Sequence, residues 1–406
     1  MKGKKFVLLL SVLLFLLLSV SSLFVTALKW DAAQYLRIGD YLASGNEENF
    51  VPLWLPLLSF VYAGLFTLFG REAGIAIAKL LYSFFISLTP FVLYLISKKL
   101  TGKEENAVLS AFGALSFPYL YWATKLYLDP IATFLFLLAF YLYVFRGRET
   151  ASGILFGFAC LFKMFFLSYV FLFLFLFGSR RQKLRTFFVI SLILFPWFAF
   201  NYFAFGSPLY ILEQNFLIYS RSFSSPAAHP LYAVEDVLFS LALAGLAFLY
   251  VFGKERDRTG VFILVFFPLL FLLPGTKEIR YILPSILLIF PYISRIPKRV
   301  FLLVVMVFAA VNLWEYAELQ LSDFYCGSHE FEETGKYISA IGRNEKIYAN
   351  DFWPVLSWFS GRSVLYCGDC EHVKGYAIMV NSEEIQCNLE REIIGKCFTV
   401  RIYHCK

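Results

Sequence analysis

Charged side chains at the ends of apolar stretches are the first candidates for chemistry in this chain. Asp31 follows one long apolar run and Asp129 opens another, and a carboxylate within hydrogen-bond reach of an alcohol can take up its proton. Arg280 stands at a similar boundary, and a guanidinium binds phosphate through two parallel hydrogen bonds. Lys163 is the only charged residue between positions 153 and 177, so it needs a partner, a wet cavity or an interface.

Each of these residues also has an ordinary interpretation. Asp31 could be a solvated loop acid, and Asp129 could be an acid that the helix dipole favours at a helix start. Lys163 could extend along its aliphatic stem to the polar edge of a bilayer. Arg280 could pair with Glu278 or with a lipid headgroup. Which interpretation holds for each residue depends on the helices and loops that position it.

The composition is that of a polytopic membrane protein. The 406 residues are 59% hydrophobic and include 49 Phe, far more apolar sequence than a soluble core needs. The net charge of +7 does not indicate nucleic-acid binding, because the basic residues lie in short loops between apolar runs. The first run, 6–27, exceeds the about 7–15 residues of a signal-peptide core, which favours an uncleaved span.

Lysine and arginine in alternate loops predict how the spans are oriented. Apolar stretches of sufficient length predict about eleven spans, at 6–27, 75–97, 107–124, 131–145, two within 153–177, 186–205, 237–252, 260–273, 281–294 and 300–314. The positive-inside rule places the N-terminus in the cytoplasm, and the loop with Asp31 and everything after 314 on the extracytoplasmic side. A plasma-membrane location is expected.

Two segments need a different geometry. Counting 53–70 as a span would place the basic loop 98–106 outside, so a juxtamembrane or re-entrant helix is predicted there. The 25 residues of 153–177 lie between two basic loops and require an even number of crossings. A short helical hairpin or broken helix that turns near Lys163 satisfies both conditions.

The chain changes character near residue 315. Mixed charge and short strand-like runs at 346–349 and 363–366, with a helix over 331–341, predict a small extracytoplasmic α/β domain, 315–406, after a transmembrane region, 1–314. Six of the seven cysteines fall here, which indicates disulfides in an oxidising compartment: Cys326, Cys367, Cys370, Cys387, Cys397 and Cys405. Zinc binding at the C-x2-C pair and free thiols are the alternatives, although no second such pair exists.

Several short motifs, in their order and sidedness, resemble the C-type polytopic glycosyltransferases. The resemblance is closest to the branch of protein O-mannosyltransferases and aminoarabinose transferases, and it extends over the first 300 residues or so. It is carried by 31–41, 52–57, 68–70, 115–119, 128–130, 153–163, 196–197 and 280–284. Two departures concern acceptor identity and phosphate contacts: Ala32 replaces a second acid, and Trp54-Leu55 replaces a basic residue before the loop proline.

The resemblance implies an activity and residue roles. These enzymes use polyprenyl-phosphate sugars as donors, and the acid at the position of Asp31 acts as the catalytic base in an inverting displacement at the anomeric carbon. The counterpart of Asp129 lies at the active site, where it would orient a substrate or a divalent cation, so a cation is left open as cofactor. A phosphate-facing Lys163 also fits the family.

Further candidates lie in the outer loops. Lys125, one turn before Asp129, and Lys277, beside Arg280, would add positive charge for the donor phosphate. The loop from 212 to 230 could face the acceptor, with Glu213, Tyr219, Arg221 and His229 as its candidate binding residues. No nucleotide-binding or zinc-protease motif occurs.

The sequence therefore predicts an α-helical polytopic glycosyltransferase, transferring a hexose or pentose from a polyprenyl (dolichyl or undecaprenyl) phosphate to a hydroxyl of a protein, glycan or lipid acceptor. A lipid or solute transporter or flippase is one alternative, although transporters commonly show paired repeats with broken helices, and only one span is predicted to be broken here. A non-catalytic membrane subunit that binds a partner through the cysteine-rich domain is the other.

Overall fold

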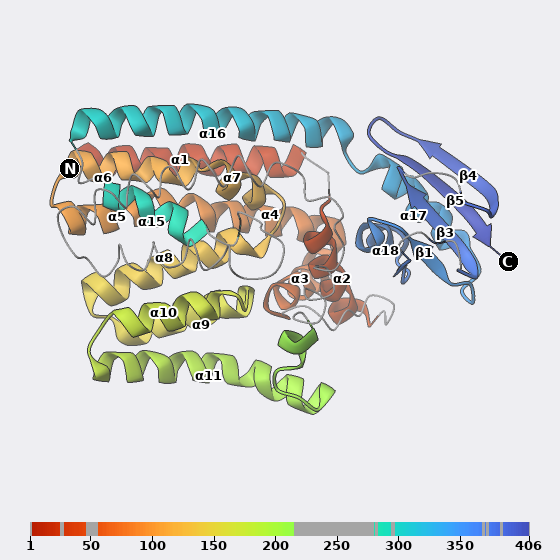
Figure 1. Cartoon of the computed structure of the whole chain (residues 1–406), viewed down its shortest axis with the longest axis horizontal. Helices are drawn as coiled ribbons and strands as arrows, with labels where there is room; N and C mark the ends of the chain where they lie inside the picture. The colour runs from red at the N-terminus through yellow and green to blue at the C-terminus, as the bar shows by residue number, and fades with distance from the viewer. Residues whose placement is uncertain are drawn as a thin grey trace. The chain divides into compact units, whose positions relative to one another are not determined.

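The computed structural model describes residues 2–24, 28–45, 56–214, 280, 283–293, 297–367, 370, 373–381 and 385–405. The predicted spans 237–252 and 260–273 lie outside these residues, as do the candidate site residues Tyr219, Arg221, His229 and Lys277. The protein is mostly helical, with a small sheet near the C-terminus (Figure 1). It divides into two compact units, one formed by residues up to 19 with 81–317 and the other by 20–80 with 318–406.

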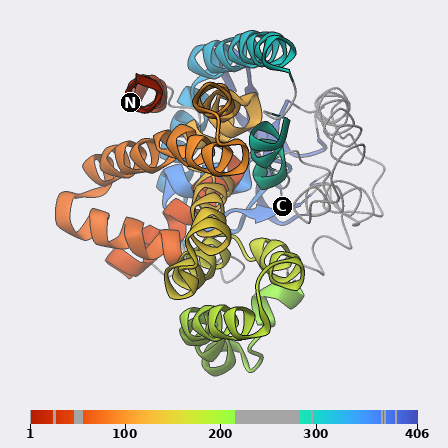
Figure 2. The same cartoon turned by 90° about the vertical axis from the view of Figure 1, so that its left-hand side faces the viewer.

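The first unit is a helical bundle. Its helices are the N-terminal part of α1 (Lys2–Phe24), the end of α4 (Arg71–Ser87), α5 (Thr89–Thr101), α6 (Glu104–Ala111), α7 (Phe117–Thr124), α8 (Leu128–Arg146), α9 (Glu149–Phe162), α10 (Phe166–Leu176), α11 (Arg180–Phe205), α15 (Leu283–Ile293) and most of α16 (Lys298–Cys326). α9 packs between α8 and α11 (Figure 1), and Figure 2 shows this group after a 90° turn. The fully buried rings of Phe136, Phe140, Phe156 and Phe173 join α8, α9 and α10.

The apolar helices are those of an integral membrane protein. Among the described residues, five helical segments are long and apolar enough to cross a bilayer: α1, the α4–α5 pair, α8, α11 and the segment that begins with α16. They overlap the predicted spans 6–27, 75–97, 131–145, 186–205 and 300–314. The number of spans and the orientation of the termini stay predictions.

Two helical segments are interrupted, one as predicted and one where a continuous span was predicted. The predicted hairpin within 153–177 is present, because α9 ends at Phe162 and α10 begins at Phe166. The predicted span 107–124 is instead divided into α6, a 3-10 turn over Phe112–Leu115, and α7. The break falls at Ser116, whose ψ of 124° is not helical, immediately before Phe117 and Pro118 begin α7. Proline has no amide hydrogen to donate to the preceding turn, which explains the break.

The second unit combines an N-terminal helical pair with the C-terminal domain. α2 (Trp30–Ser44) packs against α3 (Pro56–Phe69), so the predicted outer loop is largely helical, and α3 is the helix expected within 53–70. α2 also contacts α18 (Trp353–Ser360). The Arg71 guanidinium lies 3.5 Å from the ring centroid of Trp358 and donates a 2.8 Å hydrogen bond to its carbonyl oxygen. These contacts join the helices that follow α1 to the C-terminal domain.

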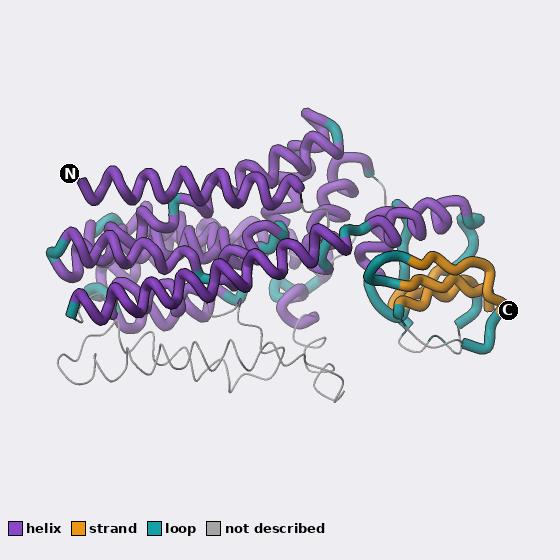
Figure 3. The backbone as a smooth tube through the Cα atoms, turned by 90° about the horizontal axis from the view of Figure 1, so that it is seen from above, coloured by secondary structure: helices purple, strands orange, loops and turns teal. Residues whose placement is uncertain are grey.

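The C-terminal domain is an α/β fold. Its sheet, drawn in orange in Figure 3, contains β1 (Ile347–Ala349), β2 (Leu365–Tyr366), β3 (Gly375–Val380), β4 (Asn388–Ile394) and β5 (Thr399–Cys405). The strand order is β2-β1-β3-β5-β4. β1 pairs in parallel with β2 and β3, whereas β5 is antiparallel to β3 and β4. α17 (His329–Ala340) matches the predicted helix. α16 continues past residue 315, so the change in composition lies within a helix, and the domain boundary stays a prediction.

Disulfides connect the cysteines of this domain. Cys326 pairs with Cys397, Cys367 with Cys370, and Cys387 with Cys405. The predicted disulfide chemistry is confirmed. The C-x2-C pair is itself one of the three disulfides, so none of these six residues is a free thiol. Cys160, within α9, is a buried free thiol.

Candidate active site

A buried ion pair lies at the centre of the first unit's candidate site. Asp129 is in the first turn of α8 and fully buried, and Lys163 stands where α9 ends. The extended backbone of Lys163 (φ −144°, ψ 108°) interrupts the helix there. Its Nζ atom lies 3.8 Å from Oδ2 of Asp129. Among the described residues, the structure thus brings together two candidates that are 34 positions apart, and gives Lys163 the partner that its burial requires.

The carboxylate of Asp129 has unused hydrogen-bonding capacity within the described part of the chain. Neither of its oxygen atoms accepts a hydrogen bond there. An ionised carboxylate offers about four acceptor positions, and a fully buried one is stabilised by occupying them. A substrate hydroxyl, a water molecule or a cation could do so. The described residues contain no group of three His, Cys, Asp or Glu side chains that could hold a metal ion, so a divalent cation stays a prediction.

Arg280 lies against an aromatic pair in the same unit. Its guanidinium carbon is 5.3 Å from the ring centroid of Trp122 and 4.6 Å from that of Tyr127, and the two rings are 4.5 Å apart. Arg280 is only 6% exposed. An aromatic face stabilises a cation through its negative electrostatic potential and does not neutralise its charge.

The turn between α7 and α8 places these rings. Leu126 has a φ of 58°, a left-handed conformation that is costly for a branched side chain, and it separates Lys125 from Tyr127. Lys125 is 4% exposed, with Nζ 5.3 Å from the ring centroid of Tyr121. The sequence analysis named Lys125 but missed the aromatic residues. The concentration of Tyr and Trp directly before Asp129 is the signal that could have indicated them.

Asp31 belongs to the second unit. It is the second residue of α2 and only 7% exposed, so it is not a solvated loop acid. Gln34 and Arg37 follow at helical spacing and are 1% and 2% exposed. α2 therefore buries a polar face, Asp31-Gln34-Arg37, in place of a purely apolar one. Gln34 and Arg37 were not among the predicted site residues, and their positions three and six residues after Asp31 were the available signal.

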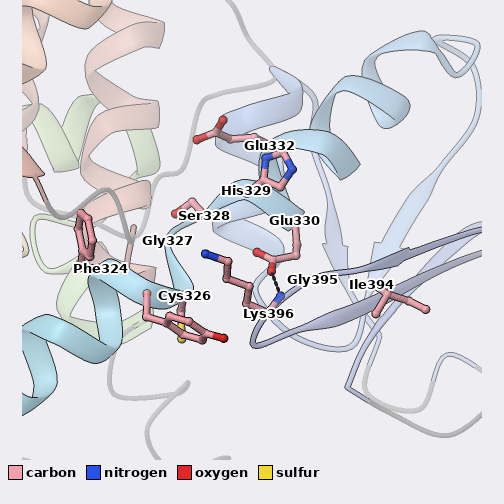
Figure 4. A pocket seen from close by; sticks show the side chains of 11 residues that line it. Phe324, Cys326, Gly327, Ser328, His329, Glu330, Glu332, Ile394, Gly395 and Lys396 are labelled. Carbon is pink, nitrogen blue, oxygen red and sulfur yellow. Dashed lines mark hydrogen bonds between the residues drawn. The ribbon is translucent and has the colours of Figure 1, made fainter.

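The second unit also contains a groove with a volume of about 590 Å³ (Figure 4). It is lined by the end of α16, the start of α17 and the turn after β4. The buried carboxylate of Glu330 accepts a 2.8 Å hydrogen bond from the backbone amide of Lys396, and Lys396 Nζ lies 4.9 Å from the ring centroid of Tyr325. Acids and a base are mixed in its lining, so the groove lacks the excess of positive charge that a phosphate site needs.

Of the four residues predicted to bind the acceptor, only Glu213 lies in the described part of the chain. Glu213 lies beyond the end of α11, where it is exposed and accepts a 2.9 Å hydrogen bond from the Ser207 hydroxyl. The other three acceptor candidates, and Lys277 for the phosphate, fall outside the described residues. Acceptor binding by these residues therefore stays a prediction.

Sequence comparison and structure comparison give different results. No protein-family model and no curated protein matches the chain. Among solved structures, ArnT from Cupriavidus metallidurans bound to undecaprenyl phosphate is similar with a TM-score of 0.64 and 13% identity, over 97% of both chains. The apo state of the same protein gives 0.59 and 13% identity, over 96% of this chain and 97% of that one.

An archaeal structure extends the comparison. The oligosaccharyltransferase of Archaeoglobus fulgidus, solved with zinc and sulfate, is similar with a TM-score of 0.54 and 12% identity, over 90% of this chain and 67% of that chain. At these identities the similarity is one of fold. It agrees with the motif order found in the sequence, and the chain has the C-type (GT-C) glycosyltransferase fold.

Proposed function

We propose that this protein is a membrane glycosyltransferase that moves a sugar from a polyprenyl-phosphate donor to an acceptor hydroxyl on the extracytoplasmic face. The fold supports this proposal, since a structure of the same fold, ArnT, is bound to undecaprenyl phosphate. The observation that carries it is the set of buried charges in a largely apolar bundle: the ion pair of Asp129 with Lys163, and Arg280 against the rings of Trp122 and Tyr127.

The proposed reaction is an inverting displacement. The acceptor oxygen forms a bond to the anomeric carbon, the bond from that carbon to the phosphate oxygen breaks, and the polyprenyl phosphate leaves with the electron pair. Asp31 takes the proton from the acceptor hydroxyl. Arg280 and Lys163, with Lys125 and Lys277, balance the negative charge that the leaving phosphate gains.

The base is tested by an Asp31→Asn variant. Purified protein would be given radiolabelled polyprenyl-phosphate sugars and membrane acceptors, and kcat and the donor KM would be measured. We expect kcat to fall by about 10²–10⁴-fold with a nearly unchanged donor KM, because a general base contributes in that range. Asp40→Asn, in the same helix, is the matched control and should keep near-normal activity.

The outcomes separate the alternatives. Equal transfer by the wild type and the Asp31→Asn variant would show that Asp31 is not the base. Absence of transfer by the wild type, across varied donors and acceptors, would contradict the enzyme and favour a transporter or a non-catalytic subunit.

The donor site is tested by an Arg280→Lys variant. Lysine keeps the positive charge but loses the planar, bidentate geometry. We expect undecaprenyl phosphate to bind about 10-fold more weakly, since a hydrogen bond to a charged group contributes about 1.5–3 kcal/mol. Titration calorimetry in detergent would measure this, with Arg391→Lys, at an exposed arginine of β4, as control. Unchanged affinity would remove Arg280 from the phosphate site.

A further inference from the structure

The start of α2 lacks a cap of its own. Lys29 is its N-cap residue and makes no side-chain capping bond, since a lysine side chain has no acceptor. Its carbonyl oxygen accepts the first helical hydrogen bond, from the Ala33 amide at 3.0 Å. The position of Lys29 therefore determines where α2 begins, and Asp31 lies two residues further on.

Two contacts from the C-terminal part of the chain hold this start. Lys29 Nζ lies 2.9 Å from Oδ1 of Asp323, and the Leu28 amide donates a 3.0 Å hydrogen bond to the Ser328 hydroxyl. The Lys29 side chain is 32% exposed and that of Asp323 11% exposed, whereas Ser328 is buried. Partial burial makes such an ion pair stronger than a fully solvated one.

Asp323 and Ser328 lie on either side of a covalently fixed corner. The Asp323 carbonyl accepts a 2.9 Å hydrogen bond from Gly327, whose φ of 60° ends α16, and the Ser328 carbonyl accepts one from Glu332 that begins α17. The disulfide from Cys326 to Cys397 ties this corner to the loop before β5. Figure 4 shows Cys326, Gly327 and Ser328 following one another at this corner. Both contacts therefore come from a corner of the chain that a disulfide and backbone hydrogen bonds fix.

We propose that Asp323 and Ser328 are positioning residues that hold the first turn of α2, and through it the carboxylate of Asp31, in the geometry for proton removal. This inference rests on the proposed function of Asp31 as base. A small displacement of the Asp31 carboxylate would lower the reaction rate, because general-base catalysis depends on its alignment with the acceptor hydroxyl. The C-terminal domain then contributes to catalysis without touching substrate.

A charge exchange tests the ion pair. Lys29→Glu and Asp323→Lys place like charges opposite each other, and we expect each to lower kcat about 10-fold while the donor KM changes little. The double variant Lys29→Glu/Asp323→Lys restores opposite charges and should recover most of the lost kcat. Arg401→Glu, which places like charges in the more exposed pair with Glu392, is the control and should stay within about twofold of the wild type.

The hydrogen bond is tested separately, in case the charge variants fold poorly. Ser328→Ala removes the acceptor of the Leu28 amide, whereas Ser328→Thr keeps a hydroxyl. We expect the alanine variant to lower kcat several-fold and the threonine variant to restore it. Normal kcat in Ser328→Ala and in both single charge variants would overturn the proposal.

Hydrogen exchange separates this inference from the proposed function. The Ala33 amide should exchange faster in Asp323→Lys and in Ser328→Ala, while the amides of β3 and β5 should keep their wild-type rates. This readout needs no substrate. Wild-type protein without transfer activity would contradict the proposed function alone, whereas unchanged exchange at Ala33 in both variants would overturn the positioning by Asp323 and Ser328.

Discussion

The pairing of Asp129 with Lys163 shows that a buried charge needs a partner of opposite charge close to it. Each side chain is expensive to bury alone, and at 3.8 Å they compensate one another. The apolar run around Lys163 predicted that it needs a partner, and the α9–α10 break was predicted at the same place. The identity of that partner was not predictable, because the two residues belong to different helices.

Removing one member of this ion pair should lower the free energy of unfolding more than removing both. Lys163→Met leaves Asp129 buried and uncompensated, which we expect to destabilise the protein by about 3–5 kcal/mol. The double variant Asp129→Asn/Lys163→Met removes both charges and should recover part of that loss. Thermal unfolding in detergent measures the difference, and equal destabilisation of the single and double variants would show that the two residues are not coupled. Neither variant should bind donor normally.

At the scale of elements, two glycines determine how closely α9 approaches α11. A Cβ atom on Gly153 would lie 2.8 Å from Val189 Cβ, and one on Gly157 2.8 Å from Ile193 Cβ. Both distances are too short for real carbon contacts. The spacing Gly-x3-Gly is typical of closely packed membrane helices, whose association depends on packing because lipid is as apolar as the side chains.

Enlarging Gly157 should therefore separate the two helices. We expect Gly157→Leu to destabilise the bundle by about 1–3 kcal/mol, the usual cost of overpacking. Ala151→Leu adds comparable volume to an exposed position of the same helix and should have little effect. Resistance to heat-induced aggregation in detergent would compare the two. A Gly157→Leu variant as stable as Ala151→Leu would show that α9 and α11 are not in close contact.

At the scale of the whole molecule, the disulfides differ in how much chain they enclose. Cys326 and Cys397 are 71 residues apart, Cys387 and Cys405 are 18 apart, and Cys367 and Cys370 only three. A cross-link stabilises the folded state chiefly by restricting the unfolded chain, and the restriction grows slowly with loop length. The first bridge also ties the end of α16 to the sheet domain.

Loss of the disulfide that encloses the longest loop should consequently lower the unfolding free energy the most. We expect Cys326→Ala/Cys397→Ala to lower the unfolding free energy of the C-terminal domain by about 1 kcal/mol more than Cys387→Ala/Cys405→Ala, from loop entropy alone. The measurement is the urea dependence of amide exchange in β3 and β5 of the full-length protein. The opposite order would show that the buried packing of Cys405 outweighs loop entropy.

The sequence by itself determined the properties that depend on neighbouring residues and on composition. Apolar run length predicted the five described helical segments that are long enough to cross a bilayer, although not the break within 107–124. Cysteine distribution predicted disulfides, and the short apolar interval around Lys163 predicted a broken helix. Motif order predicted the GT-C fold, although identity to the solved structures is only 12–13%. These signals are local or additive, so they can be read without knowing which segments meet.

Only the tertiary structure decided the contacts between distant segments. It paired Asp129 with Lys163, placed Arg280 over Trp122 and Tyr127, and joined Lys29 to Asp323 across 294 positions. It also showed that Asp31 lies on a buried polar face of a helix and not in an open loop. Such partnerships depend on how helices pack and where they end, which no local pattern of residues specifies.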